Sequence, residues 1–307
     1  MIFRAPNRRI VHSRALLIGC GLALTLACAP DAPATAPENA ESTDNSESTR
    51  PISSPDRSTA ETAAIVAESA ESKLAPLRAA VKKNPQSAQA IRALARELHD
   101  LNFKEESAAQ FERLLEIDPS PRTLLELGLA YTGAGRFDDA IRTYEKRLES
   151  IPNDPITLHN LGSIAYRRDD FAAAADYYRR AIDAKPDYLL AHCRLGDSLK
   201  AVENYREAYR AYEAVLNLEP RNANEAEEYV NAMYELASLD LMMGAYQRAG
   251  QFLTEVLRVA PEHRSAYYAY GQVLLQLGQP ELAQQALNRH AELLEKRQAE
   301  GAAAGGE

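Results

Sequence analysis

The sequence contains no tryptophan, and aromatic residues make up only 7% of its 307 residues. Because so little aromatic volume is available, the composition favours helices packed through small side chains over a large β core. Positive charge is also in short supply: 35 lysines and arginines face 44 aspartates and glutamates, which gives a net charge of -9. General binding to nucleic acid requires clustered lysine and arginine, so this balance argues against a nucleic-acid partner.

The sequence also lacks an apolar run near its N-terminus that is long enough to cross a membrane. The uncharged, mostly apolar run there has 13 residues, from Ala15 to Ala27. A membrane-spanning helix needs about 20 such residues. The run follows a basic segment with four arginines and no acidic residue, which is typical of a secretory signal. We therefore expect residues 1–27 to be a signal peptide.

Cysteine is rare, and its placement supports export. The segment Leu24-Thr25-Leu26-Ala27-Cys28 resembles a bacterial lipobox. This resemblance implies cleavage before Cys28, which would then carry the lipid anchor; the alternatives are ordinary cleavage and an uncleaved anchor. Cys20 is the weaker candidate because Arg14 lies too close to it. With Cys20 removed and Cys28 acylated, Cys193 is the only thiol left, so no intramolecular disulfide can form.

Large apolar residues are almost absent from residues 28–59, which consist mainly of Pro, Ala, Ser, Thr, Glu and Asp. Such a segment cannot bury enough surface to offset the entropy of ordering, so we expect a disordered acidic tether. Periodic apolar residues in 60–87 predict an N-terminal capping helix or degenerate half repeat. At the other end, residues 297–307 are rich in Gly and Ala, and we expect a disordered tail.

What the sequence does contain is a ladder of prolines between these ends. Their successive spacings are 34, 33, 34, 34 and 41 residues, at Pro85, Pro119, Pro152, Pro186, Pro220 and Pro261. Each segment holds two stretches with helical apolar periodicity, and proline ends the second because it cannot continue the hydrogen-bond ladder. The period therefore predicts six helix-turn-helix repeats over residues 88–296.

Small residues recur at two positions of each repeat, and a larger apolar residue follows one helical turn after the second. The eighth position holds Ala95, Gly128, Gly162, Gly196, Ala237 and Gly271. The twentieth holds Ser107, Ala140, Ala174, Ala208, Ala249 and Ala283. The twenty-fourth holds Phe111, Tyr144, Tyr178, Tyr212, Leu253 and Leu287. Small residues on both helices allow close approach of the helix axes, and the larger side chain fills the gap to the next repeat.

In this combination the chain resembles the tetratricopeptide repeat family, whose 34-residue pattern has small residues at positions 8 and 20 and proline at 32. The resemblance implies an all-α fold, a right-handed α-solenoid of about six repeats. Seven extra residues, Ala223–Tyr229, precede the fifth repeat. Either the first helix of that repeat is longer, or the superhelix is locally offset there.

The family resemblance also implies a concave groove, lined by the first helix of each repeat, that binds protein partners. Carried onto this sequence, the groove residues beyond Gln89 are Arg92, Arg96, His99, Arg122, Leu125, Leu129, His159, Ser163, Tyr166, Arg167, Cys193, Asp197, Lys200, Tyr234, Ser238, Met242, Tyr268 and Gln272. The first half of this set is basic and polar, and its end is aromatic. We expect it to accept an extended acidic segment, with the tyrosines holding apolar side chains. The alternative is a solvated groove with no fixed ligand.

Constellations for catalysis are missing from the sequence. The glycines at Gly128, Gly133 and Gly135 lack the Lys-Ser/Thr of a phosphate loop. His192 and Cys193 are adjacent and not at metal-ligand spacing. We therefore expect no enzymatic activity, no cofactor and no metal site.

The sequence thus predicts a scaffold or adaptor for a bacterial cell-envelope assembly, such as a pilus, an outer-membrane biogenesis machine or a peptidoglycan-enzyme complex. Ala29, after the acylated cysteine, favours the outer membrane facing the periplasm. The alternatives are a glycan- or peptide-binding module and a regulator of an envelope enzyme. Partner identity and oligomeric state stay open.

Overall fold

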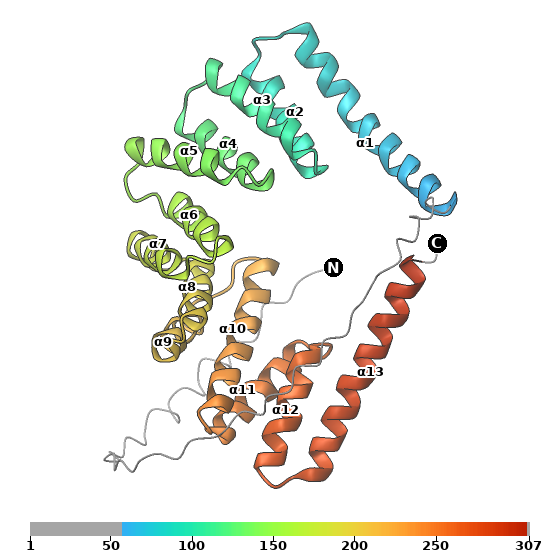
Figure 1. Ribbon diagram of the computed structural model, residues 1–307, viewed down its shortest axis with the longest axis vertical. Coiled ribbons are helices and arrows are strands. Elements are labelled where there is room, and N and C mark those ends of the chain that lie inside the picture. The colour runs from blue at the N-terminus through green and yellow to red at the C-terminus, as the bar shows by residue number, and fades with distance from the viewer. Residues whose placement is uncertain (1–56, 306–307) are drawn as a thin grey trace, which may run out of the picture. The chain divides into compact units, whose positions relative to one another are not determined.

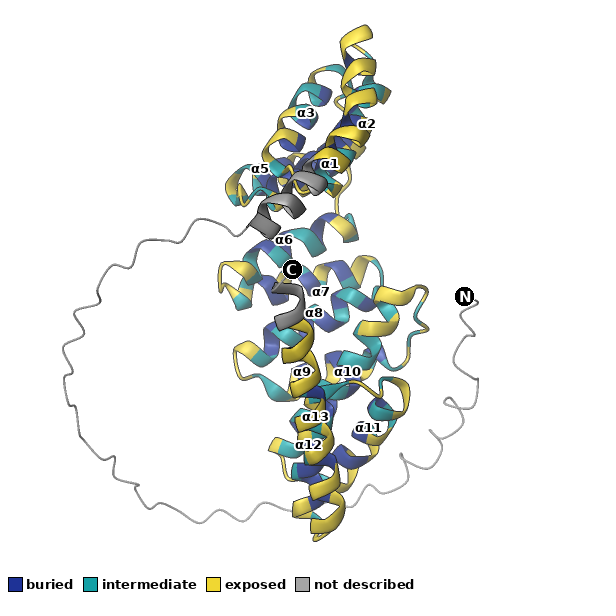
Figure 2. Ribbon diagram, turned by 90° about the vertical axis from the view of Figure 1, so that its right-hand side faces the viewer, coloured by how far each residue is buried: buried dark blue, intermediate teal, exposed yellow. Residues whose placement is uncertain are grey.

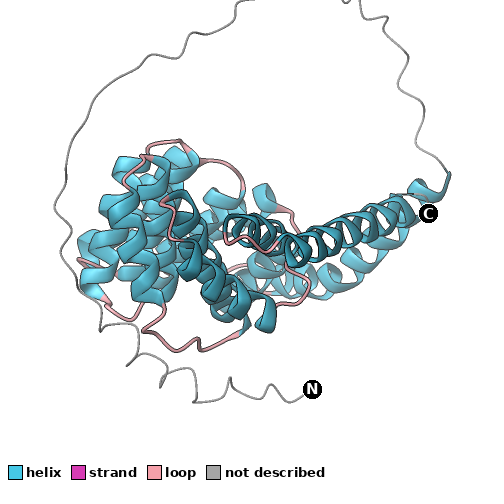
Figure 3. Ribbon diagram, turned by 90° about the horizontal axis from the view of Figure 1, so that it is seen from below, coloured by secondary structure: helices cyan, strands magenta, loops and turns pink. Residues whose placement is uncertain are grey.

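The computed structural model describes residues 57–305, with side chains from 68 to 301. Over this range the chain forms thirteen α-helices and no strand, which confirms the all-α prediction (Figure 1, Figure 3). The expected signal peptide, the lipidated Cys28 and the tether as far as residue 56 lie outside the described residues.

One long helix precedes six helix pairs, as the proline ladder predicts (Figure 1). The helices are α1 (Arg57–Lys83), then α2 (Ala88–Asp100) with α3 (Lys104–Ile117), α4 (Pro121–Gly133) with α5 (Phe137–Ser150), α6 (Pro155–Arg167) with α7 (Phe171–Ala184), α8 (Leu189–Ala201) with α9 (Tyr205–Val215), α10 (Ala223–Met242) with α11 (Tyr246–Val259), and α12 (Arg264–Gln276) with α13 (Pro280–Gly305).

The ends of the helices follow from local sequence signals. Ser87, Ser120, Asp154 and Asn222 each cap a first helix, because their side-chain oxygens accept a hydrogen bond from a backbone N–H of the first turn. All six ladder prolines lie outside the helices: Pro85 lies between α1 and the first pair, and the other five lie in the loops between pairs. Each turn inside a pair contains one residue with a positive φ, at Asn102, Gly135, Asp169, Glu203, Gly244 and Gly278. In three of these turns the residue is a glycine, which marks the turn in the sequence. In the other three it is Asn102, Asp169 or Glu203, so the sequence shows no glycine there.

The helices of a pair approach closely through the predicted small residues. All six residues at the twentieth position are fully buried. Buried residues recur along the paired helices (Figure 2). A Cβ added at Gly128 would lie 2.3 Å from Cε1 of Tyr144, and at Gly196 it would lie 2.5 Å from Cε1 of Tyr212. Real Cβ atoms are not found this close to another heavy atom, so the tyrosine ring occupies the space that the missing side chain leaves.

Two boundaries differ from those expected, and the fifth repeat follows one of the two alternatives given for it. Helix α1 begins at Arg57, so the last three residues of the expected tether are helical. Helix α13 continues to Gly305, because alanine, glutamine, glutamate and arginine favour helix and no proline interrupts them. The expected disordered tail is therefore wrong over residues 297–305. The extra segment Ala223–Tyr229 forms the first turns of α10, so the first helix of the fifth repeat is longer.

Candidate partner-binding surface

The first helix of each pair carries the residues expected to meet a partner. Arg92, Arg96 and His99 lie on α2, and the remaining residues of the set lie on α4, α6, α8, α10 and α12. We call the predicted residues on these six helices the first-helix surface. Their exposure ranges from exposed to buried, and this variation separates residues available to a partner from residues that pack inside the protein.

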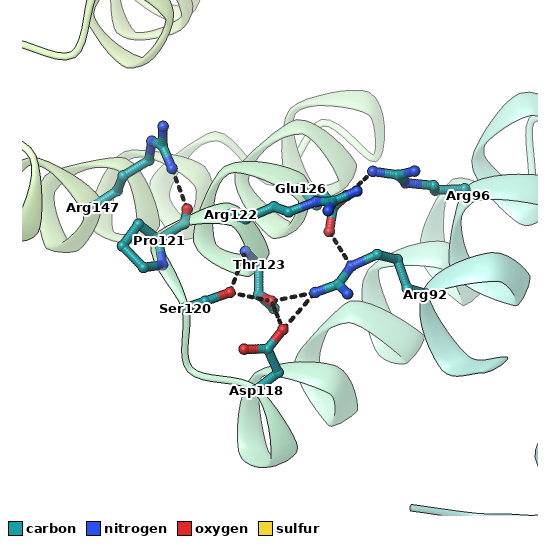
Figure 4. A network of polar contacts seen from close by, with 9 residues as sticks. All are labelled: Arg92, Arg96, Asp118, Ser120, Pro121, Arg122, Thr123, Glu126 and Arg147. Atoms are coloured by element: carbon teal, nitrogen blue, oxygen red, sulfur yellow. Dashed lines mark hydrogen bonds and ion pairs between the residues drawn. The ribbon is translucent and has the colours of Figure 1, made fainter. Parts of the chain in front are cut away.

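Three arginines of this surface converge on one acidic side chain, Glu126 of α4 (Figure 4). The Nε atom of Arg92 donates to Oε2 of Glu126 at 2.9 Å. Arg96 pairs with Oε1 of the same carboxylate, and Nε of Arg122 lies 3.5 Å from it. The Glu126 side chain is only 10% exposed, whereas Arg96 and Arg122 are 51% and 63% exposed. The carboxylate thus lies beneath the guanidinium groups of the two exposed arginines.

Arg92 is also held from a second side. It donates to Asp118 at 2.6 Å and to the hydroxyl of Thr123 at 3.0 Å (Figure 4). The hydrogen bond from Arg92, together with one that the Thr123 hydroxyl donates to Asp118 at 3.3 Å, lowers the pKa of the Asp118 carboxyl. With its side chain 17% exposed, Arg92 joins α2 to the start of α4.

Part of the positive charge expected on this half of the surface is therefore neutralised within the protein. Three arginines face two carboxylates in this cluster, which leaves one unit of net positive charge. Beside them lies a surface pocket of about 510 Å³ lined by Ala88, Gln89, Arg92, Ala93, Arg96 and Arg122. The sequence reasoning missed Glu126 because it considered only the positions that the family uses for contact.

Opposite charges about 34 residues apart in the sequence are the signal that would have identified this acidic partner. Arg92 and Glu126 are 34 residues apart, and so are Arg194 and Glu228. Lys200 pairs with Glu235, 35 residues further on, at 2.5 Å. Opposite charges about 34 residues apart lie on the first helices of neighbouring repeats, so they meet when the repeats stack.

Other members of the predicted surface are engaged in packing. The hydroxyl of Tyr178 bonds to that of Ser163 at 3.1 Å, and the hydroxyl of Tyr212 donates to Asp197 at 2.7 Å. Both tyrosines are buried at the twenty-fourth position of their repeats. Ser163 and Asp197 thus serve as polar partners for core tyrosines.

His159 and Tyr144 present buried polar atoms without a hydrogen-bond partner. The Nε2 atom of His159, the hydroxyl of Tyr144 and the Nδ2 atom of Asn160 are all in this state. The ring of His159 packs between Tyr178 at 5.5 Å and Tyr188 at 5.3 Å, and burial lowers its pKa to about 4. His159 is therefore an uncharged, packed histidine at neutral pH.

Cys193 is the clearest departure from the predicted set. It is 3% exposed, and its Sγ atom donates weakly to the backbone carbonyl of Glu228 at 3.7 Å. Burial raises the pKa of the thiol to about 12. The prediction that Cys193 lines an open groove is therefore wrong, because α10 covers it.

Exposed large apolar side chains occur in both halves of the repeat region. Met242 is 62% exposed and Tyr268 is 48% exposed, whereas Tyr234 is half-buried and packs on His263 with ring centroids 5.0 Å apart. On α4, Leu129 is 41% exposed. In the described part of the chain, no helix is long and apolar enough to cross a membrane, and no group of three or more His, Cys, Asp or Glu is placed to hold a metal.

Sequence comparison identifies the family. Models of the tetratricopeptide repeat match residues 92–155, 125–188, 190–222 and 240–304. The chain belongs to the tetratricopeptide repeat (TPR) family. The matched ranges fall on the helix pairs described above, so these pairs are TPR units.

The matches to curated relatives cover only part of this TPR chain and part of each relative. Human RNA polymerase II-associated protein 3 is 33% identical over 115 residues, which is 38% of this chain and 17% of that protein. The peroxisomal targeting signal receptor of Kluyveromyces lactis is 30% identical over 118 residues, again 38% of this chain and 20% of that protein. The chain spans at most about a fifth of the length of these relatives.

Solved structures share the TPR fold. MamA aligns with a TM-score of 0.51 and 22% identity, covering 56% of this chain and 97% of its own. Cut9, in the structure of the APC/C hetero-tetramer Cut9-Hcn1, aligns with a TM-score of 0.54 and 17% identity, covering 74% of this chain and 45% of that one. These likenesses concern the arrangement of helices and leave the partner of this TPR protein open.

Proposed function

We propose that this protein is a scaffold that binds an extended acidic segment of another protein on α2 and α4. The observation that carries the proposal is the pocket beside Arg92, Arg96 and Arg122. TPR units present their first helices to partners as a repeating surface, and stacked repeats of this kind serve mainly in binding.

The chemistry of the cluster favours a carboxylate ligand. Arg96 and Arg122 are more than half exposed, and their guanidinium groups share the single buried carboxylate of Glu126. A guanidinium can form several hydrogen bonds in a planar fork, so both side chains keep donors for an incoming carboxylate. In a chain with a net charge of -9, such a cationic spot also lowers the repulsion that an acidic segment meets.

The test uses a defined probe, a fluorescein-labelled peptide of eight glutamates, with binding followed by fluorescence anisotropy. Replacing Arg96 and Arg122 by glutamate should weaken binding at least tenfold, because both changes reverse a charge at the pocket. Arg92 is left intact because it joins two repeats. The matched control replaces Arg142 and Arg289 by glutamate, which changes the net charge equally on α5 and α13. An equal loss in both pairs would show general attraction, and unchanged binding in the first pair would remove the proposal.

We further propose that the protein is anchored through Cys28 to a bacterial envelope membrane, where it assembles proteins on the periplasmic side. The support is the lipobox-like segment that precedes Cys28, together with the acidic, apolar-poor stretch that follows it. Several acyl chains on one cysteine would attach the protein stably to the membrane, whereas a single chain binds membranes only marginally. Cells fed a palmitate analogue should label the native chain and the Cys20→Ala variant but not Cys28→Ala. Equal labelling of both variants would refute the anchor.

A further inference from the structure

The last helix pair holds a second pocket with a cationic lining. Helices α12 and α13 pack side by side (Figure 1). A surface pocket of about 420 Å³, which we call the α12/α13 pocket, lies between the start of α12 and the C-terminal half of α13. Its charged lining residues are Arg264, Lys296, Arg297, Glu262 and Glu300. Three cations and two carboxylates leave the pocket with one unit of net positive charge.

Arg264 differs from every other arginine that is partly or fully buried in the described part of the chain. Six arginines are in this class: Arg92, Arg113, Arg147, Arg179, Arg194 and Arg264. Four of them pair with carboxylates, and Arg113 donates to the backbone carbonyl of Pro85. The guanidinium of Arg264 makes no hydrogen bond, ion pair or ring contact with the described residues. Removing a charged group from water is unfavourable unless it is paired, so this state indicates a place for an anion from another molecule.

The backbone around Arg264 is held in place although its guanidinium has no partner. The Nδ1 atom of His290 donates to the backbone carbonyl of Arg264 at 3.1 Å, which joins α12 to α13. The Nδ1 atom of His263 accepts from the backbone N–H of Ala266 at 3.1 Å and so caps α12. Burial lowers the pKa of His263, so this residue adds no charge to the pocket at neutral pH. The walls of the pocket are therefore fixed by contacts within the protein.

The acidic residues of the lining leave both arginines available. Glu262 pairs with Lys296 at 2.9 Å. Arg297 forms no ion pair with Glu300 or with any other described residue. It lies on the part of α13 that extends beyond the expected end of the fold. Two guanidinium groups, one from each helix, thus keep their donors for a ligand in one pocket.

The net charge of the pocket favours a carboxylate over a phosphate. A carboxylate carries one negative charge, which matches the single excess positive charge of the lining, and it can accept two hydrogen bonds from a guanidinium. A phosphate group on a protein carries about 1.5 to 2 negative charges at neutral pH, so it would leave negative charge without a partner beside Glu262 and Glu300.

We propose that the α12/α13 pocket is a second carboxylate-binding site, which takes a single glutamate or aspartate side chain of a protein partner. Arg264 and Arg297 supply the hydrogen-bond donors for it. A partner with two separate acidic stretches is then held at the first repeat and at the last. The site has its own residues, so it does not depend on the site proposed on α2 and α4.

The experiment measures how fast single arginines of the full chain react with phenylglyoxal, an arginine-specific reagent, by mass spectrometry after digestion. The ligand is a capped peptide with one glutamate among glycines and serines, and its controls carry glutamine or phosphoserine in place of that glutamate. At saturation the glutamate peptide should slow the reaction of Arg264 and Arg297 at least fivefold, and the glutamine peptide less than twofold. Arg206 and Arg210 on α9 are exposed and have no ion pair among the described residues, so their rates should stay unchanged.

A variant shows whether the two arginines act together. In Arg264→Gln the glutamate peptide should slow the reaction of Arg297 less than twofold, because half of the donors are lost. The matched variant Arg206→Gln, which removes the same charge on α9, should leave the protection of Arg297 at its full value. Full protection of Arg297 in Arg264→Gln would show that Arg264 does not bind the carboxylate.

The outcomes also separate this site from the one on α2 and α4. A glutamate peptide that leaves the rate of Arg264 unchanged, or slows Arg206 equally, would overturn the site. Equal or stronger protection by the phosphoserine peptide would overturn its assignment to a single carboxylate. In the same assay the peptide of eight glutamates should protect Arg96 and Arg122. Loss of that protection alone would remove the proposed function and leave the α12/α13 pocket as a carboxylate site.

Discussion

The three buried tyrosines at the twenty-fourth repeat position offer a sharp test of the packing, because the same ring meets three different polar environments. Tyr144 has no partner for its hydroxyl, although Thr132 and Asn160 lie close enough to affect its pKa. Tyr178 bonds to a neutral hydroxyl at 3.1 Å, and Tyr212 donates to a carboxylate at 2.7 Å. Replacement by phenylalanine removes only the hydroxyl in each case.

The expected effects differ in size and in sign. For Tyr212→Phe we expect a loss of about 2 kcal/mol in the free energy of unfolding, because a hydrogen bond to a charged group is broken. For Tyr178→Phe the loss should be about 1 kcal/mol, the usual value for a neutral pair. For Tyr144→Phe we expect no loss, or a gain of up to about 1 kcal/mol, because a buried hydroxyl without a partner is itself unfavourable.

The assay must report on single repeats, because a solenoid need not unfold as one unit. Native-state hydrogen exchange gives the opening free energy of the amides in α5, α7 and α9, the helices that carry these tyrosines. Each variant serves as the control for the other two. If Tyr144→Phe lost as much stability as Tyr212→Phe, the Tyr144 hydroxyl would have a strong partner, and the reasoning would be refuted.

Two further predictions concern the same region. Gly128→Ala should lower stability by about 1–2 kcal/mol despite its better helix propensity, because the new Cβ would lie 2.3 Å from the Tyr144 ring. Adding Tyr144→Leu to Gly128→Ala should remove most of this loss in urea unfolding, because the fifth repeat has Ala237 and Leu253 at the same two positions. A loss that persists in the double variant would contradict the contact. His159, with its pKa lowered to about 4, stays neutral when folded, whereas the unfolded chain takes up a proton near pH 6.5. The contribution of His159 to the free energy of unfolding should therefore be fully present above pH 6.5 and fall by about 3 kcal/mol as the pH drops to 4. A His159→Gln variant measured alongside should lack this part of the decline.

Much of the fold follows from the sequence because its signals are local and periodic. Ser120 and Asp154 predict helix starts through their own side chains, and the ladder prolines mark the breaks between pairs. Close helix packing at Gly128 follows from the absence of a side chain there. The continuation of α13 to Gly305 departs from the expected disorder, because an existing helix extends readily through alanine even where glycine is frequent.

The partner surface was predicted less completely. Position in the repeat places Arg96, Arg122 and Tyr268 on first helices, and all three are exposed in the structure. It gives no indication that Glu126 lies beneath the arginines, since that contact joins neighbouring repeats. Nor does it show that Cys193 is covered, because the cover arises only when the longer α10 stacks on α8.

The sequence by itself therefore determined the repeat, its six copies and the residues that close each helix pair, because these depend on side chains near one another along the chain. The tertiary structure alone decided how much charge the first-helix surface keeps and where that surface is interrupted. Arg92 and Glu126 are 34 residues apart in the sequence, and so are Arg194 and Glu228. Such pairs meet only when consecutive repeats stack, so local pattern cannot show which charges are already neutralised.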